Sequence, residues 1–153
     1  EGLVTKPRTS AGNGAFYAYS TSNPSSTAGA QHGVVFTTLG NGGGYSTSTG
    51  RYTCPVAGWY SFTTNVRIDS YNSTTGYMRI AFYVGTTPTT AQTGYSQGHA
   101  IYGPGTHSGN YYSMTTHWQQ YLGEGTQVGV AVFSNTGTYM RHSESNFTGI
   151  LLG

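Results

Sequence analysis

Hydrophobic and polar residues alternate over nearly five repeats between residues 60 and 69. One set of alternate positions holds Tyr60, Phe62, Thr64, Val66 and Ile68, and the positions between them hold Ser61, Thr63, Asn65, Arg67 and Asp69. Alternation with a period of two is typical of a strand that has one buried face. We therefore predict a long strand over residues 58–69, with Tyr60, Phe62, Val66 and Ile68 in the core.

Shorter runs of the same kind follow one another along the rest of the chain. Gly, Pro, Asn and Ser separate them, and the predicted strands cover residues 15–19, 32–39, 77–84, 93–102, 110–122, 127–135 and 145–152. The glycine-rich segment 40–44 is expected to form only a turn. Residues 1–14 are a polar lead-in, and residues 15–153 form one domain of about eight to ten strands, with the spacing of a β-sandwich. Phe147, in the last strand, is a further core residue.

The composition supports an all-β domain and argues against several partners. Charged residues make up 7% of the chain, against about 25% in ordinary domains. The net charge of +2 is scattered along the sequence, so no basic stripe is present for nucleic acid. No apolar run is long enough for membrane insertion. Cys54 is the single cysteine, and we expect its thiol to be a small buried hydrophobic group.

Four blocks of sequence resemble a known family. They are Ala15-Phe16-Tyr17-Ala18, Gly44-Tyr45 with Thr49-Gly50-Arg51-Tyr52-Thr53-Cys54-Pro55-Val56-Ala57-Gly58-Trp59-Tyr60-Ser61-Phe62, the strand from Leu122 to Val130, and Phe147-Thr148-Gly149-Ile150-Leu151-Leu152. In this order they resemble the C1q globular head of the C1q/TNF-like superfamily. The resemblance implies a ten-stranded jelly-roll β-sandwich that assembles as a tight homotrimer. Trimer formation also fits a low-charge jelly roll, which would otherwise expose apolar surface; a monomer kept in solution by Ser and Thr is the alternative.

The chain departs from this family at one position that bears on calcium. The family usually has an aspartate after the glycine of the leucine–glycine strand, where this chain has Gly125-Thr126. With one Asp and three Glu in total, a calcium site built from several carboxylates is not expected. His99, His107, His117 and His142 have no known metal-binding spacing, so we predict no metal and no cofactor.

One motif raises the question of catalysis. Gly94-Tyr95-Ser96-Gln97-Gly98 fits the G-x-S-x-G nucleophile elbow, which requires a strand-to-helix turn to expose its serine. No helix is predicted after Ser96, and the only Asp, Asp69, precedes the serine, whereas the acid of the elbow follows it. The sequence therefore predicts a protein that is not an enzyme.

Ligand contacts are expected in three loops, covering residues 70–76, 102–110 and 135–142. Loops on a rigid scaffold commonly carry recognition. The candidate ligand-binding residues are Tyr71, Tyr102, His107, Tyr139 and Arg141. Aromatic faces, hydrogen-bond donors and one guanidinium suit a glycan. The alternative is that these loops only close the end of the sandwich.

Three functions remain open for such a head. The first is a virion module, a phage fibre tip or capsid decoration, since Gly2-Leu3-Val4-Thr5-Lys6-Pro7 and Leu151-Leu152-Gly153 resemble the two ends of C1q-like domains in phage structural proteins. The second is a secreted animal C1q-domain protein for pattern recognition or adhesion. The third is a structural cement protein without a ligand. The expected partners are other copies of the chain and, in addition, either a cell-surface glycan or glycoprotein or other virion proteins. The expected location is the virion surface or the outside of the cell.

Overall fold

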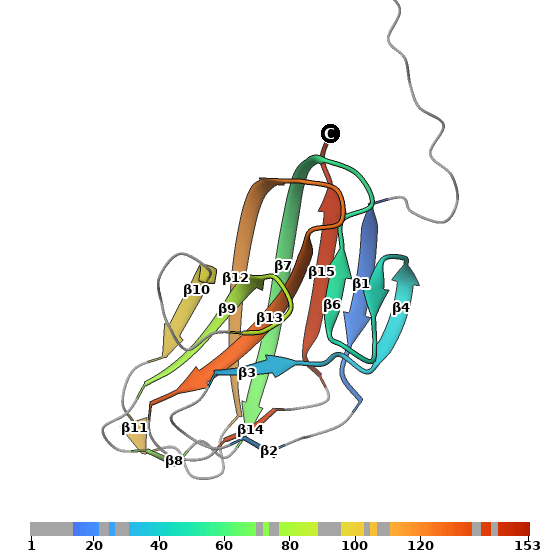
Figure 1. The fold of residues 1–153 in the computed structure, drawn as a ribbon. Coiled ribbons are helices and arrows are strands. Elements are labelled where there is room, and N and C mark those ends of the chain that lie inside the picture. Colours follow the sequence, from blue (N-terminus) through green and yellow to red (C-terminus); the bar gives the residue numbers. More distant parts are fainter. Residues whose placement is uncertain are drawn as a thin grey trace, which may run out of the picture.

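Two antiparallel sheets pack face to face in the computed structural model (Figure 1). The structure describes residues 14–21, 25–26, 31–69, 72–73, 77–88, 96–102, 105–106, 111–135, 139–141 and 144–153. The strands of this part are β1 (Ala15–Tyr19), β2 (Ser25–Ser26), β3 (Gln31–Val34), β4 (Thr38–Gly42), β5 (Tyr45–Ser46), β6 (Arg51–Thr53), β7 (Gly58–Asp69), β8 (Asn72–Ser73), β9 (Met78–Val84), β10 (Ser96–Tyr102), β11 (Gly105–Thr106), β12 (Tyr111–Leu122), β13 (Gln127–Ser134), β14 (Tyr139–Arg141) and β15 (Asn146–Leu151). Within these ranges no helix is long and apolar enough to cross a membrane.

The first sheet, which we call the β7 sheet, is built around the predicted long strand. β12 pairs with β7 along its whole length, from Leu122 opposite Gly58 to Tyr111 opposite Asp69. On the other side of β7, β15 pairs with residues 60–65 and β14 with residues 68–69. β1 and β4 continue the sheet beyond β15, and β2 lies beyond β14.

The second sheet, the β13 sheet, has a similar arrangement around β13. β9 pairs with β13 on one side, while β6 and β3 pair in succession with residues 127–129 and 130–133. β10 extends the sheet beyond β9, and β5 extends it beyond β6. The all-β jelly-roll class predicted from the sequence is therefore confirmed.

Aromatic side chains from both sheets fill the space between them. Tyr60, Phe62, Val66, Ile68 and Phe147 are at most 1% exposed and belong to the core cluster. The Phe62 ring contacts Phe82 of the β13 sheet, with 6.2 Å between ring centroids, and stacks on Trp118 of β12 at 5.8 Å. Strands with one buried face account for this packing, because every second side chain points inward.

Three details differ from the sequence prediction. The predicted strand 32–39 is two strands, β3 and β4, separated by residues 35–37. The glycine-rich segment predicted as a turn lies partly in β4, whose residues Asn41 and Gly42 pair with β1. The third difference is β9, in which residues 78–83 are all buried, whereas its alternating pattern predicted one exposed face.

Candidate interaction surfaces

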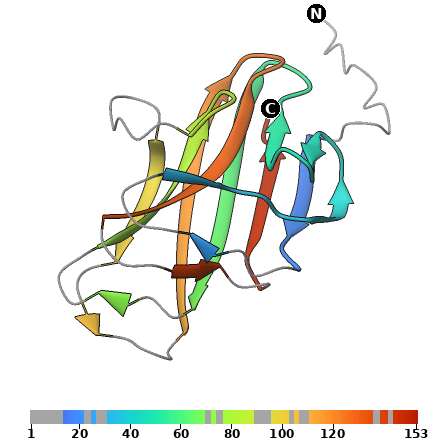
Figure 2. The same ribbon diagram turned by 60° about the horizontal axis from the view of Figure 1, so that its bottom comes forward.

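The three predicted ligand-binding loops emerge at the same end of the sandwich. Asp69, at the end of β7, pairs with both Tyr111 of β12 and Met140 of β14. Met78, at the start of β9, pairs with both Tyr102 of β10 and Ser134 of β13. Each of the three connections therefore leaves one sheet and enters the other at this end, where Figures 1 and 2 show β8, β11 and β14.

The five candidate ligand-binding residues are placed to different degrees. Tyr71 and His107 lie outside the described residues. Tyr102 is the last residue of β10, and Tyr139 and Arg141 belong to the short strand β14, so these three are strand residues and not loop residues. β8 pairs with β11, which ties segment 72–73 to segment 105–106. The backbone thus brings the candidate segments together at one end of the molecule.

A second surface, which the sequence analysis did not single out, is the outward face of the β7 sheet. Trp59 and Tyr121 are directly opposite each other on β7 and β12, and both are 53% exposed. Their rings meet edge to face, with 6.1 Å between centroids. Ile150 and Leu152 are also about half exposed. We call these four residues the apolar patch.

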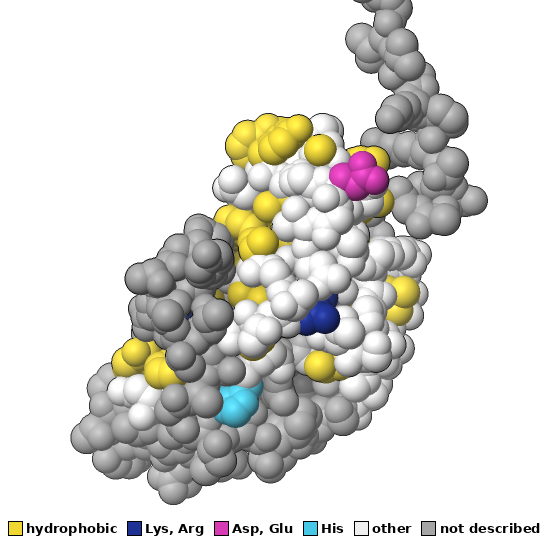
Figure 3. Space-filling view, in the orientation of Figure 1, with side chains coloured by type: hydrophobic (Ala, Val, Ile, Leu, Met, Phe, Trp, Pro, Cys, Tyr) yellow, Lys and Arg dark blue, Asp and Glu magenta, His cyan; other side chains and the backbone are white. Residues whose placement is uncertain are grey.

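The apolar patch lies at the opposite end of the sheet from the loops. Leu152 adjoins it because its N–H donates to the Trp59 carbonyl at 2.7 Å, while the Trp59 N–H donates to the Gly153 carbonyl at 2.9 Å. Figure 3 shows the molecule from the side of the β13 sheet, and hydrophobic side chains are also visible on that side at this end. The signal in the sequence was the position of Trp59, one residue before the buried Tyr60 and hence on the outward side of β7.

Beyond the apolar patch, the same face becomes polar and then charged. Ser61 and His117 are joined across the strands by a hydrogen bond of 2.9 Å between Oγ and Nε2. Further along, the Asn65 amide donates to the Thr115 hydroxyl at 2.8 Å. Hydroxyl and amide groups of this kind form cross-strand pairs that contribute modestly to sheet stability.

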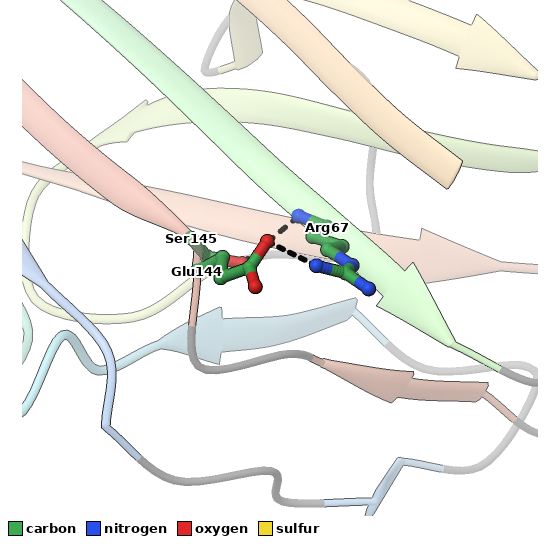
Figure 4. A network of polar contacts seen from close by, with 3 residues as sticks. All are labelled: Arg67, Glu144 and Ser145. Atoms are coloured by element: carbon green, nitrogen blue, oxygen red, sulfur yellow. Dashed lines mark hydrogen bonds and ion pairs between the residues drawn. The ribbon is translucent and has the colours of Figure 1, made fainter. Parts of the chain in front are cut away.

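An ion pair lies near the loop end of this face. The Arg67 guanidinium contacts the Glu144 carboxylate, and the Arg67 backbone N–H donates to the buried Ser145 hydroxyl at 2.9 Å (Figure 4). Glu144 is largely exposed, so solvent screens the pair and its net stabilisation is small. The contact therefore serves mainly to fix the chain just before β15.

The described residues offer little that resembles a catalytic centre. A shallow hollow of about 220 Å³ lies between β1 and β4 and is lined by Ala15, Phe16, Tyr17, Asn41 and Gly42, which supply no carboxylate, imidazole or thiol. Ser96 begins a strand that pairs antiparallel with β9 and therefore does not occupy a strand-to-helix turn. No group of three or more His, Cys, Asp or Glu side chains that could hold a metal occurs in the described ranges.

The buried titratable groups also have the properties of core residues. Burial raises the pKa of the Cys54 thiol to about 11, although a hydrogen bond with Tyr60 works in the other direction. Burial likewise raises the pKa of Tyr45 and of Tyr52 well above the ordinary value. Because a thiol acts as a nucleophile in its deprotonated form, Cys54 is unsuited to that role at neutral pH.

Comparison with known families decides the identity of this sandwich. The C1q domain family matches residues 15–152. The chain belongs to the C1q domain family. A search of curated proteins found no match.

Solved structures show the same fold for this C1q domain. The globular domain of zebrafish complement 1qA protein is similar, with a TM-score of 0.61 and 17% sequence identity, over 91% of this chain and 97% of that one. The Eiger TNF of S. frugiperda is also similar, with a TM-score of 0.59 and 11% identity, over 91% of this chain and 92% of that one. C1q and TNF-like domains are in general non-catalytic binding modules that form trimers.

Proposed function

We propose that this C1q domain is the non-catalytic binding head of a homotrimer, in which the outward face of the β7 sheet contacts the other copies. The observation that carries this proposal is the exposed Trp59–Tyr121 pair beside Ile150 and Leu152. Large aromatic residues dominate the energy of protein interfaces. Exposed apolar clusters of this kind on a soluble domain commonly mark such contacts.

The solution mass tests self-association. Light scattering at micromolar concentration should give about three times the 16.2 kDa of one chain. Trp59→Ser should shift the mass toward that of a monomer, because it removes the largest exposed ring of the apolar patch. Val56→Ser is the matched control, since Val56 is an exposed apolar residue that precedes β7 and lies outside the patch.

The control variant should remain trimeric. A wild-type mass of one chain would refute the trimer. If Trp59→Ser and Val56→Ser both remained trimeric, the β7-sheet face would be the wrong interface and the trimer would have to use another surface.

We further propose that the trimer is a virion module, a phage fibre tip or capsid decoration, that recognises a glycan on a host surface. Two features support this role: the chain ends resemble those of C1q-like domains in phage structural proteins, and the three candidate loops emerge at one end of the sandwich. That end is opposite the apolar patch, so the loops stay accessible in a trimer built on the patch. The similarity to the zebrafish domain concerns the fold and does not favour an animal role.

A glycan array, followed by binding to whole candidate host cells, tests recognition. Tyr71→Ala, Tyr102→Ala and Tyr139→Ala should each weaken binding, with Tyr19→Ala of β1 as a tyrosine control outside the loops. If all three loop variants bound as well as wild type, the loop assignment would be wrong. If no surface ligand were found, the structural cement role would replace recognition.

A further inference from the structure

Arg79 is a buried cation on the outer face of the β13 sheet. Met78, Ile80 and Phe82 of the same strand belong to the core cluster, so Arg79 points to the other face. Its residue surface is only 5% exposed. The guanidinium carbon lies 5.5 Å from the ring centroid of Phe133, the residue directly opposite on β13.

An aromatic platform holds this guanidinium in place. The Phe133 ring also packs against Tyr77, with 5.8 Å between the ring centroids. Tyr77 is tied to Asn135 in both directions, because its N–H donates to the Asn135 side-chain oxygen at 2.6 Å and its carbonyl accepts the Asn135 N–H at 3.2 Å. Tyr77, Phe133 and Arg79 therefore form a row fixed at the ends of β9 and β13.

Neither of the two acids whose side chains are described, Glu124 and Glu144, provides a partner for this charge. Glu144 is paired with Arg67. Glu124 lies before the start of β13, whereas Phe133 and Arg79 are near its other end, about 20 Å away along the strand. Asp69 belongs to β7, in the other sheet.

The hydrogen bonds of the guanidinium are also incomplete. Within the described part of the chain, the Arg79 Nε is buried and has no hydrogen-bond partner. Arg51 of the same sheet also has a buried Nε without a partner among the described residues, but it is only half-buried and its Nη1 donates to the Thr86 carbonyl. A buried cation with an unused donor is costly unless an anion completes it.

We propose that Arg79 anchors a binding site for a carboxylate group. The guanidinium is planar and presents its donors as a fork, which matches the two oxygens of a carboxylate. The cation–π contact with Phe133 restrains the guanidinium before a ligand arrives. The adjacent Tyr77 and Phe133 are aromatic and only partly buried, and aromatic rings commonly pack on sugars, so an acidic sugar is the carboxylate source that we test. The proposal depends on neither trimer formation nor a virion role.

Thermal unfolding in chloride buffer of constant ionic strength tests the site, with sodium glucuronate, sodium acetate and glucose as probes. Glucuronate present at about ten times its dissociation constant should raise the midpoint of wild type by about 3–6 °C. Glucose should produce no shift. Arg79→Met should abolish the glucuronate shift. Arg79→Lys keeps the charge but loses the forked arrangement of donors, so it should reduce the shift. If Arg79→Met does not fold, the Arg79→Lys result alone tests the proposal.

Arg51→Met is the matched control and should keep the wild-type shift. A shift with acetate as large as that with glucuronate would support the carboxylate site and exclude a contribution from the sugar ring. The proposal would be overturned if wild type responded to neither carboxylate, or if both Arg79 variants responded as wild type does. A shift of equal size with glucose would also overturn it.

Discussion

Tyr45 and Tyr52 both stack on Phe16 in the core, but their hydroxyl groups have different environments. The ring centroids lie 5.4 and 4.5 Å from that of Phe16. The Tyr45 hydroxyl accepts a hydrogen bond of 2.8 Å from the backbone N–H of Phe36. The Tyr52 hydroxyl is buried and has no hydrogen-bond partner in the described part of the chain. The two residues therefore form a natural pair for separating ring packing from hydrogen bonding.

We predict opposite effects for the two phenylalanine substitutions. Tyr45→Phe should lower the free energy of unfolding by about 1–3 kcal/mol, because it leaves the buried N–H of Phe36 unpaired. Tyr52→Phe should leave this free energy unchanged or raise it by up to about 1 kcal/mol, because it removes an unsatisfied buried hydroxyl. Urea unfolding of the two variants and wild type measures both changes. Equal losses in the two variants would contradict the prediction and assign the hydroxyls equal roles.

At the scale of single elements, the strands that could be predicted are those with one buried face. β7 has the predicted bounds because its inward side chains face the core and its outward ones remain partly exposed. β9 is different, since Arg79, Ala81 and Tyr83 are buried as well as Met78 and Phe82. A two-residue period shows which residues share a face, but it cannot show that both faces are covered, because covering depends on distant segments.

The candidate surfaces were predictable only in part, because the sequence shows the composition of each segment but not which distant segments come together. Loop composition identified the segments around Tyr102 and Tyr139, since aromatic residues next to Gly, Asn and Ser stand out in the sequence. The pairing of β8 with β11, which brings two of these segments together, joins residues more than thirty positions apart. The Trp59–Tyr121 pair joins two strands still further apart in the sequence. Neither contact is visible in a local pattern.

The glycines of β4 act through space and backbone conformation, which explains why the turn prediction for this segment was wrong. Gly42 has a φ of 84°. A Cβ at this position would meet the carbonyl oxygen of Ala15 on β1. Gly42 is therefore required by a close approach between paired strands and is not a sign of flexible chain.

This difference leads to a prediction for Gly42→Ala, with Gly85→Ala as the matched control. Both positions have positive φ, and a side chain there costs about 1–2 kcal/mol. A Cβ on Gly85 has no neighbour within 4 Å among the described residues, so only Gly42→Ala is expected to add a clash with backbone. We expect Gly42→Ala to lower the free energy of unfolding by about 1–3 kcal/mol more than Gly85→Ala, as measured by urea unfolding. Equal losses would show that β4 moves away from β1 at little cost.

At the scale of the whole molecule, the domain combines a core rich in phenol groups with very few charges. Tyr45, Tyr52, Tyr60, Tyr83 and Cys54 are all at most 7% exposed. Burial is the largest cause of the raised pKa of each of these groups. These thiol and phenol groups therefore lose their protons only in the alkaline range, and at a higher pH in the folded chain than in the unfolded chain.

The stability of the domain should therefore decrease in alkali. A raised native pKa means that the folded chain keeps protons that the unfolded chain releases, so the free energy of unfolding falls as pH rises. This contribution is fully present below about pH 8.5, where the unfolded thiol begins to titrate, and the tyrosines add to its loss above about pH 10. Each group that is protonated only in the folded state removes about 1.4 kcal/mol per pH unit. Between about pH 8 and pH 10.5 the total loss should be about 3–5 kcal/mol.

Urea unfolding at these two pH values, followed by tyrosinate absorbance, measures the effect. Tyrosinate from the buried residues should appear together with unfolding and not before it, because the folded core keeps these phenols neutral. Tyr52→Phe removes one titrating group and should make the alkaline loss about 1 kcal/mol smaller than in wild type. A free energy of unfolding that did not change over this range would mean that solvent reaches the phenols in the folded protein. The packing of Tyr52 and Tyr60 at the centre of the sandwich would then be wrong.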